Sequence, residues 1–399
     1  MGIIVQKYGG SSVATVEKIQ AIAERVIKRK NEGDSVVVVV SAMGDTTDDL
    51  ISLAKRTSNN PDKRELDALL STGEIISSSL LAMAIQCKGN ESVSYTGYQI
   101  NIKTTDSHGK ALIKDLNEDR IKQSLYEGKI VIVAGFQGVD SDGDITTLGR
   151  GGSDTTAVAL ACKLDAVCEI YTDVDGIYSV DPRKLKNAKK LENIYYEEIL
   201  ELASLGAQVI HSRAVELASK YNIPIYVGLS TGNTRGTLIM YEKNMESKEI
   251  TGIATSNEDV AINLTDINSN INIISDLFNS IAEKKINIDM ISQTAPLNGM
   301  VNISFTIPKE ELLECMTIIK VYAGKNKITV DEDITKFSVV GIGMKTTSGV
   351  AARIFKLFSQ NNIEVKMITT SEIRITCAIK RQDELNAMKL VAGEFDISR

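Results

Sequence analysis

The segment Lys7-Tyr-Gly-Gly-Ser-Ser12 joins a β-branched run to a helical pattern and could bind phosphate. Two glycines let the backbone approach an anion closely, and a helix N-terminus offers free N–H groups. Lys7 adds a positive charge suited to phosphate oxygens. The alternative is an ordinary turn in which Ser11 or Ser12 caps the helix. The GxxxxGK[ST] spacing of a P-loop is absent.

A second glycine-rich turn, Gly149-Arg-Gly-Gly-Ser-Asp154, also opens a helical pattern. Arg150 could hold a carboxylate through two parallel hydrogen bonds. Asp154 could orient Lys7 or act near a metal, although Ser153 or Asp154 could equally be a helix cap. Two such turns in one α/β region favour a ligand site over coincidence.

Three further segments carry polar side chains at the ends of apolar runs. Tyr171 to Arg183 follows a strand, where open α/β sheets bind ligands, so Thr172 and Asp173 could contact a nucleotide and Arg183 a phosphate. Taken alone, this segment is better explained as a surface loop. Ser41 to Thr47 and Ser71 to Glu74 could hold the charged groups of a small zwitterion, although Glu74 could equally stabilise a first helical turn.

The elements that must position these residues alternate between strand and helix as far as Met240. Such alternation predicts an α/β fold on a mainly parallel sheet, and the unbroken apolar run at Ser35 to Ser41 is typical of a strand covered on both faces. The other expected strands are Ile3 to Lys7, Lys129 to Ala134, Ala166 to Tyr171 and Ile223 to Val227. The expected helices are Val13 to Lys30, Asp154 to Leu164 and Tyr196 to Tyr221.

An internal repeat follows the polar segment Tyr241 to Glu249, which we interpret as a linker. Leu277-Phe278 matches Ile354-Phe355, and the same shift aligns Met290-Ile291 with Met367-Ile368. Each copy has the pattern of a small βαββαβ-like unit. We therefore predict three domains, 1–245, 246–330 and 331–399.

Composition excludes several classes of protein. The 45 basic and 52 acidic residues give a net charge of −7, which predicts neither a nucleic-acid nor a membrane partner. Five cysteines without a CxxC pair, with only His108 and His211, predict no zinc site and no disulfide scaffold. Without a signal peptide or a long apolar span, a soluble cytoplasmic protein is expected.

Taken together, the five motifs resemble the aspartate kinases of the amino acid kinase family in order and spacing. The repeat resembles that family's pair of ACT domains, small modules that bind amino acids. The resemblance implies ATP and Mg²⁺ as cofactors and L-aspartate as substrate, and it names no residue of the protein as a metal ligand. It implies catalytic roles for Lys7 and Asp154. The residues expected to contact the substrate are Ser41, Thr47, Glu74 and Arg150. Those expected to contact the nucleotide are Lys7, Tyr8, Gly9, Gly10, Ser11, Ser153, Thr172, Asp173, Tyr178 and Arg183.

The chemistry is compatible with these roles. A carboxylate is already an ionised nucleophile at neutral pH, so its attack on the γ-phosphate of ATP needs no general base. It needs charge neutralisation and in-line positioning. Gln208 is a departure, because many relatives have a lysine there. A kinase for glutamate or N-acetylglutamate, and a regulatory module without catalysis, are the alternatives.

The resemblance also implies an amino-acid effector, L-lysine first and threonine second, and a homodimer or homotetramer through the ACT domains. Asp289 could pair with the ε-ammonium of lysine, whereas the second copy has Lys366 at the matching place. The alternative is that Asp289 only caps a strand end. The residues expected to bind the effector are Asn270, Ile273, Ile274, Ile288, Asp289, Gln293 and Thr294.

Overall fold

The chain forms two compact units, each built from separate stretches of sequence. The computed structural model describes residues 2–205, 209–232, 234–241, 248–323 and 327–399. The first unit holds the described residues of 1–177, 190–203 and 208–243, and the second holds those of 178–189, 204–207 and 244–399. The predicted boundaries at 245 and 330 stay predictions.

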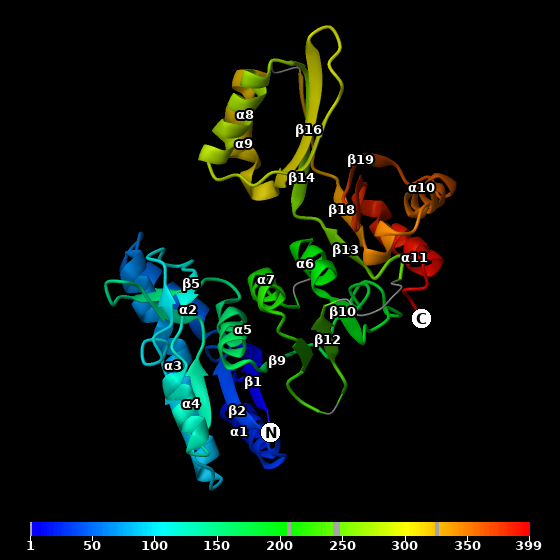
Figure 1. Ribbon diagram of the computed structural model, residues 1–399. Coiled ribbons are helices and arrows are strands. Elements are labelled where there is room, and N and C mark those ends of the chain that lie inside the picture. The colour runs from blue at the N-terminus through cyan, green and yellow to red at the C-terminus, as the bar shows by residue number, and fades with distance from the viewer. Residues whose placement is uncertain (1, 206–208, 233, 242–247, 324–326) are drawn as a thin grey trace. The chain divides into compact units, whose positions relative to one another are not determined.

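An eight-stranded sheet forms the centre of the first unit, in the order β10-β12-β11-β9-β1-β2-β6-β3. Figure 1 shows β1 (Ile3–Tyr8), β2 (Ser35–Val40) and β9 (Val167–Thr172) side by side, and the last two pair in parallel with β1. The other strands are β3 (Ser92–Tyr95), β6 (Ile130–Ala134), β10 (Asn193–Tyr195), β11 (Ile225–Leu229) and β12 (Thr237–Met240). Only β11 and β12 pair antiparallel among the described strands of this sheet. The predicted α/β fold is confirmed.

Helices cover both faces of this sheet. On one face, α1 (Val16–Asn31) and α3 (Lys63–Cys87) bury a cluster of aliphatic side chains with Tyr8. Because successive strand residues point to opposite faces, Lys7 points to the other face, where α5 (Gly152–Leu164) lies against β1. Consequently β1 supplies both a core residue and a charged group at its C-terminal end.

Shorter elements complete the first unit. A single 3-10 turn, Gly10–Ser12, follows β1. A small sheet has the order β5-β4-β7-β8, with β4 at Lys103–Thr104, β5 at Ile113–Asp115, β7 at Gln137–Val139 and β8 at Ile145–Thr147. The remaining helices are α2 (Thr46–Thr57), α4 (Asp119–Tyr126), α6 (Tyr196–Ser204) and α7 (Ser212–Tyr221).

The second unit contains two modules, each an antiparallel four-stranded sheet with two helices. The first module has the strand order β15-β16-β14-β17 and the second β13-β18-β20-β19. The first comprises β14 (Asp259–Asn268), α8 (Ile271–Glu283), β15 (Asp289–Gln293), β16 (Met300–Pro308), α9 (Leu312–Tyr322) and β17 (Ile328–Asp331). The second comprises β13 (Gly252–Ser256), β18 (Thr335–Val340), α10 (Val350–Gln360), β19 (Val365–Thr370), β20 (Arg374–Ile379) and α11 (Glu384–Glu394).

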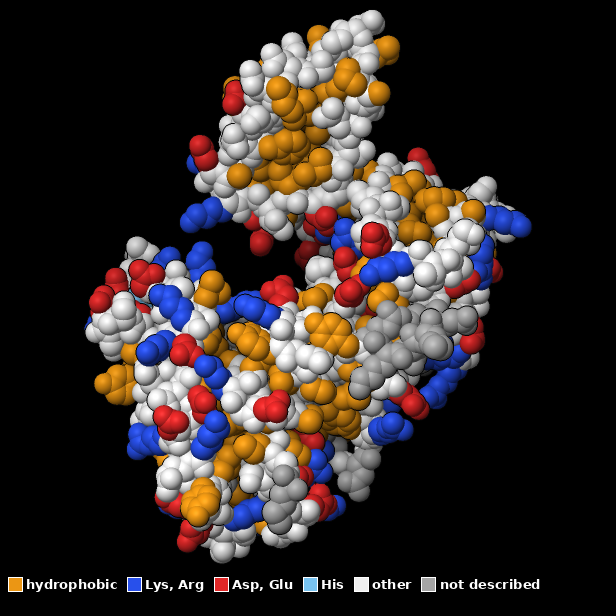
Figure 2. All heavy atoms as spheres, viewed as in Figure 1, with side chains coloured by type: hydrophobic (Ala, Val, Ile, Leu, Met, Phe, Trp, Pro, Cys, Tyr) orange, Lys and Arg blue, Asp and Glu red, His pale blue; other side chains and the backbone are white. Residues whose placement is uncertain are grey.

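The order of strands does not follow the order of the repeats. β13 precedes the whole first module in sequence but pairs with β18 of the second. The first module is thus inserted between two strands of the second. Figure 2 shows apolar side chains gathered on the module that carries α8 and α9, and Ile271, Leu313 and Val321 of these helices are exposed.

A segment from the middle of the chain, residues 178–189, belongs to the second unit. Val180 and Leu185 pack in the core of the second module. Ser179 donates its hydroxyl to the carbonyl of Ile397 at 2.6 Å, and the Asn187 amide donates to the carbonyl of Arg399 at 2.7 Å. We call residues 178–189 the strap, because they hold the C-terminal end of the chain.

Two expectations need correction. The helix expected over Tyr196 to Tyr221 is divided into α6 and α7. Ser71 to Glu74 do not open a helix but lie inside α3, so the dipole of a first turn cannot explain Glu74. By length and composition alone, α3 passes the test for a helix long and apolar enough to cross a membrane. Half of its apolar window is buried in the unit, together with polar side chains such as Asp67, so α3 is a core helix.

Candidate active site

Lys7 and Asp154 form a nearly buried ion pair. Lys7 Nζ, from β1, lies 2.6 Å from Asp154 Oδ1, in the first turn of α5, and their side chains are 10% and 12% exposed. The expectation that Asp154 orients Lys7 agrees with this geometry. Neither Asp154 nor Ser153 caps α5, because the N-cap residue is Gly151, with φ of 69° and no side-chain cap hydrogen bond. The carboxylate therefore fixes the direction of the ammonium group.

The turn after β1 packs closely against the segment that follows β2. Gly44 N donates to Gly10 O at 3.0 Å, and a Cβ on Gly10 would lie 2.9 Å from the carbonyl oxygen of Ala42. A larger residue at position 10 would push the two segments apart. The hydroxyl groups of Ser41 and Ser153 are 2.8 Å apart, which joins this region to the start of α5. Three of the sequence motifs thus meet at one edge of the sheet.

Glu74 is a buried carboxylate with one oxygen left without a partner. Its Oε1 accepts the backbone N–H of Ala42 at 3.0 Å, whereas Oε2 has no hydrogen bond among the described residues. Burial raises the pKa of Glu74 to about 7, in spite of that hydrogen bond. An unpaired carboxylate in such a place is best satisfied by a cation from a ligand.

Two further substrate candidates lie at the ends of short elements. Thr47 is half-buried in the first turn of α2. Arg150 is exposed and follows Gly149, which has a φ of 75° and packs so closely on Gly109 that a Cβ at position 149 would lie 2.9 Å from the carbonyl oxygen of Gly109. Among the described residues no hydrogen bond or ion pair engages the Arg150 guanidinium, which leaves its five donors free for an anion.

The predicted nucleotide contacts are divided between the two units of the chain. Thr172 ends β9, and its hydroxyl donates to Asp173 Oδ1 at 3.0 Å. Tyr178 and Arg183 belong to the strap, where Tyr178 packs on the core of the second module and Arg183 pairs with Asp181 at 2.9 Å. Gln208 lies outside the described residues. Gly9 remains near the ammonium group, since a Cβ there would be 3.6 Å from Lys7 Nζ.

Tyr8 needs correction as a nucleotide contact. Its side chain is fully buried on the α1 face of the sheet, opposite to Lys7, and stacks on Tyr171 with ring centroids 5.2 Å apart. Burial raises the pKa of the Tyr8 hydroxyl well above its ordinary value. Only the backbone of Tyr8 is left to face a ligand. Ser11 is exposed on the turn, and its carbonyl accepts Lys18 Nζ at 2.8 Å.

The described residues contain no cluster of three metal-ligating side chains. Mg²⁺ in kinases is commonly held by one or two carboxylates together with the phosphates of the nucleotide. Asp154 is a fitting donor, because its buried Oδ1 has no hydrogen-bond donor apart from the neighbouring ammonium of Lys7. The site thus fits an ion that arrives with the nucleotide.

Sequence reasoning missed two residues on α3. Ser77 donates its hydroxyl to the carbonyl of Ser41 at 2.7 Å. Asp67 accepts two hydrogen bonds from Thr147 of β8 and two from the loop of His108 and Gly109. Both share the face of α3 that carries Glu74, because residues three and seven apart lie on one side of a helix. That spacing was the signal available in the sequence.

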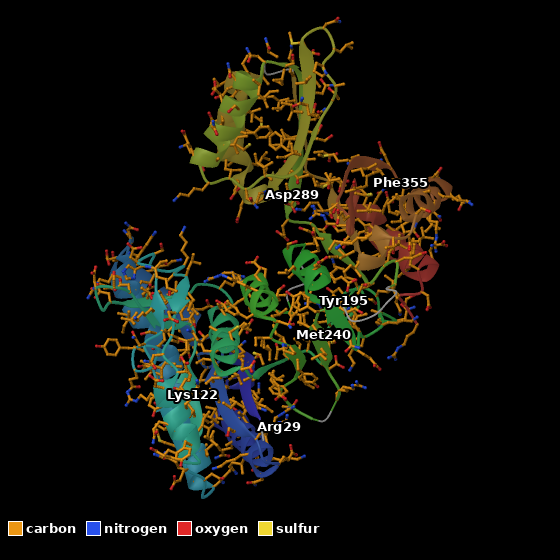
Figure 3. The ribbon with its side chains drawn as sticks, in the orientation of Figure 1. Arg29, Lys122, Tyr195, Met240, Asp289 and Phe355 are labelled. Carbon is orange, nitrogen blue, oxygen red and sulfur yellow. The ribbon has the colours of Figure 1, made fainter. Side chains whose placement is uncertain are left out.

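In the second unit, Asp289 already has a cationic partner. Asp289 Oδ2, at the start of β15, lies 3.0 Å from Lys336 Nζ of β18, and the same ammonium is 3.1 Å from Asp259. Figure 3 shows Asp289 at the end of the first module's sheet that lies toward the second module. Burial alone would raise the pKa of Asp289, but Lys336 and a backbone hydrogen bond leave it lowered.

The other expected effector contacts surround the start of α8 and the edge strand β15. Asn270 caps α8 by accepting the N–H of Asn272 at 3.0 Å, and Ile274 is buried. Gln293 and Thr294 are exposed, whereas Ile273 and Ile288 are half-buried. In the second module Lys366 pairs with Asp331 at 2.5 Å, so the two copies differ in the charge at matching positions.

Comparison with known proteins agrees with the motifs. A family model for the amino acid kinase family matches residues 2–228, and one for the ACT domain matches residues 262–321 and 337–395. Aspartokinase 2 of Bacillus subtilis is 47% identical over 404 residues, which covers 100% of this chain and 99% of that protein.

Solved structures show the same fold. Escherichia coli aspartokinase III in complex with aspartate and ADP (R-state) superposes with a TM-score of 0.82 at 23% identity, over 99% of this chain and 100% of that chain. The same enzyme in complex with lysine and aspartate (T-state) gives a TM-score of 0.80 at 23% identity, over 98% and 99%. At this identity the likeness bears on the fold.

Proposed function

The chain belongs to the aspartokinases of the amino acid kinase family, an assignment that makes it an ATP-dependent kinase acting on aspartate. From this premise we propose that it transfers the γ-phosphate of ATP to the β-carboxylate of L-aspartate and releases 4-phospho-L-aspartate. The observation that carries the proposal is the unpaired oxygen of buried Glu74, whose other oxygen binds the backbone of Ala42 in the segment that packs against the glycine-rich turn of Lys7. A substrate with an ammonium group and a reactive carboxylate matches that arrangement.

In this proposal the substrate is held at both charged ends of its backbone. Glu74 Oε2 accepts the α-ammonium group, and Arg150 binds the α-carboxylate with its free guanidinium. Ser41 and Thr47 supply hydroxyl groups near the side-chain carboxylate. Holding the ammonium and the α-carboxylate separately selects an amino acid over a simple dicarboxylate.

The nucleotide phosphates would lie at the turn after β1. Lys7, with the N–H groups of Gly10 and Ser11, would neutralise charge on the transferring group, and Asp154 would keep Lys7 in place. The N–H of Gly9 already donates to the carbonyl of Tyr171 at 3.2 Å, so Gly9 would contribute through its lack of a side chain beside Lys7. Mg²⁺, when bound with the nucleotide, supplies further charge neutralisation. Thr172 and Asp173 would contact the nucleotide, with Ser153 near the phosphates. Family resemblance adds Tyr178 and Arg183.

For regulation we assign the effector site to the first module, with L-lysine as the first candidate and threonine as the second. The lysine complex of the Escherichia coli enzyme supports the class of ligand. Asp289 supports the site, because it already binds an ammonium group, that of Lys336. The assembly would be a homodimer or homotetramer through the modules, where Ile291 and Ile368 of the edge strands are exposed. A cytoplasmic location completes the proposal.

The direct test is aspartate-dependent formation of ADP with Mg-ATP, with the acyl phosphate trapped by hydroxylamine. We expect a hydroxamate with aspartate and none with glutamate, and we expect lysine to suppress it. Turnover with glutamate alone would contradict the substrate assignment. Unchanged turnover with lysine and with threonine would contradict the effector assignment but not the reaction.

A further inference from the structure

Asp67 is a second buried carboxylate on the helix that carries Glu74, and the reaction described above does not use it. Its side chain is 2% exposed. Seven residues separate the two acids, so they lie on one face of α3 about 10 Å apart along the axis. One rigid helix therefore presents two buried carboxylates toward the same side.

Four hydrogen-bond donors converge on Asp67. Oδ1 accepts the hydroxyl of Thr147 at 2.6 Å, and Oδ2 accepts the backbone N–H of Thr147 at 2.9 Å. Oδ2 also accepts the N–H of Gly109 at 2.9 Å and lies 3.1 Å from His108 Nδ1. Buried hydrogen bonds to a carboxylate are among the stronger polar contacts in proteins.

These donors come from the two segments that shape the turn of Arg150. Thr147 ends β8, three residues before Arg150. The loop of His108 and Gly109 lies directly against Gly149, where a Cβ would meet the carbonyl oxygen of Gly109 at 2.9 Å. Ala111 N donates to Thr147 O at 2.9 Å and ties the two segments together. Asp67 thus holds both sides of the backbone that leads into Arg150.

We propose that Asp67 is a positioning residue that sets the affinity for aspartate by fixing the turn of Arg150 relative to Glu74. The inference rests on the substrate role proposed for Arg150. Because α3 carries Asp67 and Glu74 together, the groups for the α-carboxylate and the α-ammonium are held at one spacing. A loose Arg150 turn would weaken binding of the substrate while leaving the turn of Lys7 intact.

The test measures KM for aspartate, KM for ATP and kcat in Asp67→Asn. The neutral amide loses the negative charge that strengthens all four of these hydrogen bonds, so we expect KM for aspartate to rise at least tenfold. We expect kcat and KM for ATP to stay within threefold. Thr104→Val is the matched control, because it removes a buried 2.6 Å hydroxyl contact to Thr146, beside Thr147, without touching Asp67.

A double variant separates positioning from general destabilisation. Arg150→Ala alone should raise KM for aspartate, and adding Asp67→Asn should raise it by less than a further twofold, because both changes remove one interaction. Should Asp67→Asn not fold, Thr147→Val removes a single hydroxyl contact and should raise KM about threefold, with Thr147→Ser restoring it.

The outcomes that overturn the inference are distinct. A normal KM for aspartate in Arg150→Ala would overturn the role of Arg150 and this inference with it. A raised KM in Arg150→Ala, combined with a normal KM in folded Asp67→Asn, would overturn the inference alone. A fully multiplicative effect in the double variant would also overturn it.

Discussion

Glu74 connects the pH of the solution to substrate affinity. Its pKa of about 7 means that much of this carboxyl is neutral in slightly acidic solution. Only the ionised form attracts an ammonium group, so KM for aspartate should fall as pH rises through about 7 and become constant above it. Initial rates between pH 6 and 8 in a constant-ionic-strength buffer would measure this. In Glu74→Gln the KM should be higher and independent of pH over that range.

The raised pKa of Glu74 also predicts an effect on the stability of the fold. Burial raises the pKa of Glu74 from its ordinary value of 4.5, so its contribution is intact below pH 4.5 and is lost as pH rises through about 7. At pH 8 Glu74→Gln should raise the free energy of unfolding by on the order of 1–3 kcal/mol. Denaturant titration would measure it, with exposed Glu65→Gln on the same helix as the control. A less stable Glu74→Gln at pH 8 would contradict the assignment.

Lys7 should be important for the rate of the reaction. Lys7→Met removes a charge that neutralises the transferring phosphate, and we expect kcat to fall by roughly 10²–10³-fold. Asp154→Asn should cost less, about tenfold, because Lys7 keeps its charge after it loses its 2.6 Å partner. Lys18→Met, which loses a contact to the carbonyl of Ser11 in the same turn, is the control. Equal losses in Lys7→Met and Lys18→Met would contradict the role of Lys7.

Inhibition by the effector L-lysine should depend on competition between its ammonium group and that of Lys336 for Asp289. Asp289→Asn should raise the lysine concentration for half-inhibition at least tenfold. Lys336→Gln removes the internal ammonium and should lower that concentration, because the effector no longer displaces Lys336. Lys366→Gln, at the matching place of the second module, should leave it unchanged. Activity measured against lysine concentration for the three variants would test this prediction. An unaltered inhibition curve for Asp289→Asn would show that Asp289 does not bind the effector.

At the scale of residues, the sequence indicated contacts between the charged groups of the motifs better than it indicated the surroundings of those groups. The charged residues of the glycine-rich turns could be identified from type and spacing, and Lys7 does meet Asp154. The burial of Glu74 and the four hydrogen-bond donors to Asp67 could not be identified from the sequence, because they depend on segments far apart in the chain. Tyr8 was assigned to the nucleotide although strand alternation places it opposite to Lys7.

At the scale of elements, the strap should depend on the last residues of the chain. Ile397 is 3% exposed in the core of the second module, and its carbonyl accepts the Ser179 hydroxyl. Ile397→Ala should lower the free energy of unfolding by about 2–4 kcal/mol. Calorimetry would measure the midpoint of this unit. Asp396→Asn, which alters only an exposed pair with Lys189, should leave the midpoint unchanged.

The strands and helices of the first unit were largely predictable because their apolar runs are continuous. The apolar run Ser35 to Ser41 predicted the bounds of β2 to within one residue. The helix over Tyr196 to Tyr221 was wrong because its apolar spacing continues across the boundary between α6 and α7. Likewise, Ser71 to Glu74 were predicted to start a helix, because Ser and Thr favour the first positions of helices. In the structure α3 begins earlier, at Lys63, after the N-cap residue Asp62.

At the scale of the whole molecule, the sequence predicted the internal repeat. It did not predict that the first module is inserted between two strands of the second module. A shift of the apolar pattern identifies two similar modules, which the structure contains. The pattern cannot tell which sheet receives β13, because strand pairing is not encoded in the alternation of one strand. The same limit applies to the strap, whose apolar residues Val180 and Leu185 gave no sign of the unit they join.

This interleaving constrains the order in which the chain can fold during its synthesis on the ribosome. The first module is complete once β17 has emerged, whereas β13 must wait for β18, on the far side of it. The strap waits longest, because Ser179 binds a carbonyl 218 residues later in the chain. At about 5–20 residues per second, that is a delay of roughly 10–40 s. The inserted module therefore acquires its structure before the host module, and a nascent chain released before Ile397 has its catalytic motifs but lacks the partner that anchors the strap.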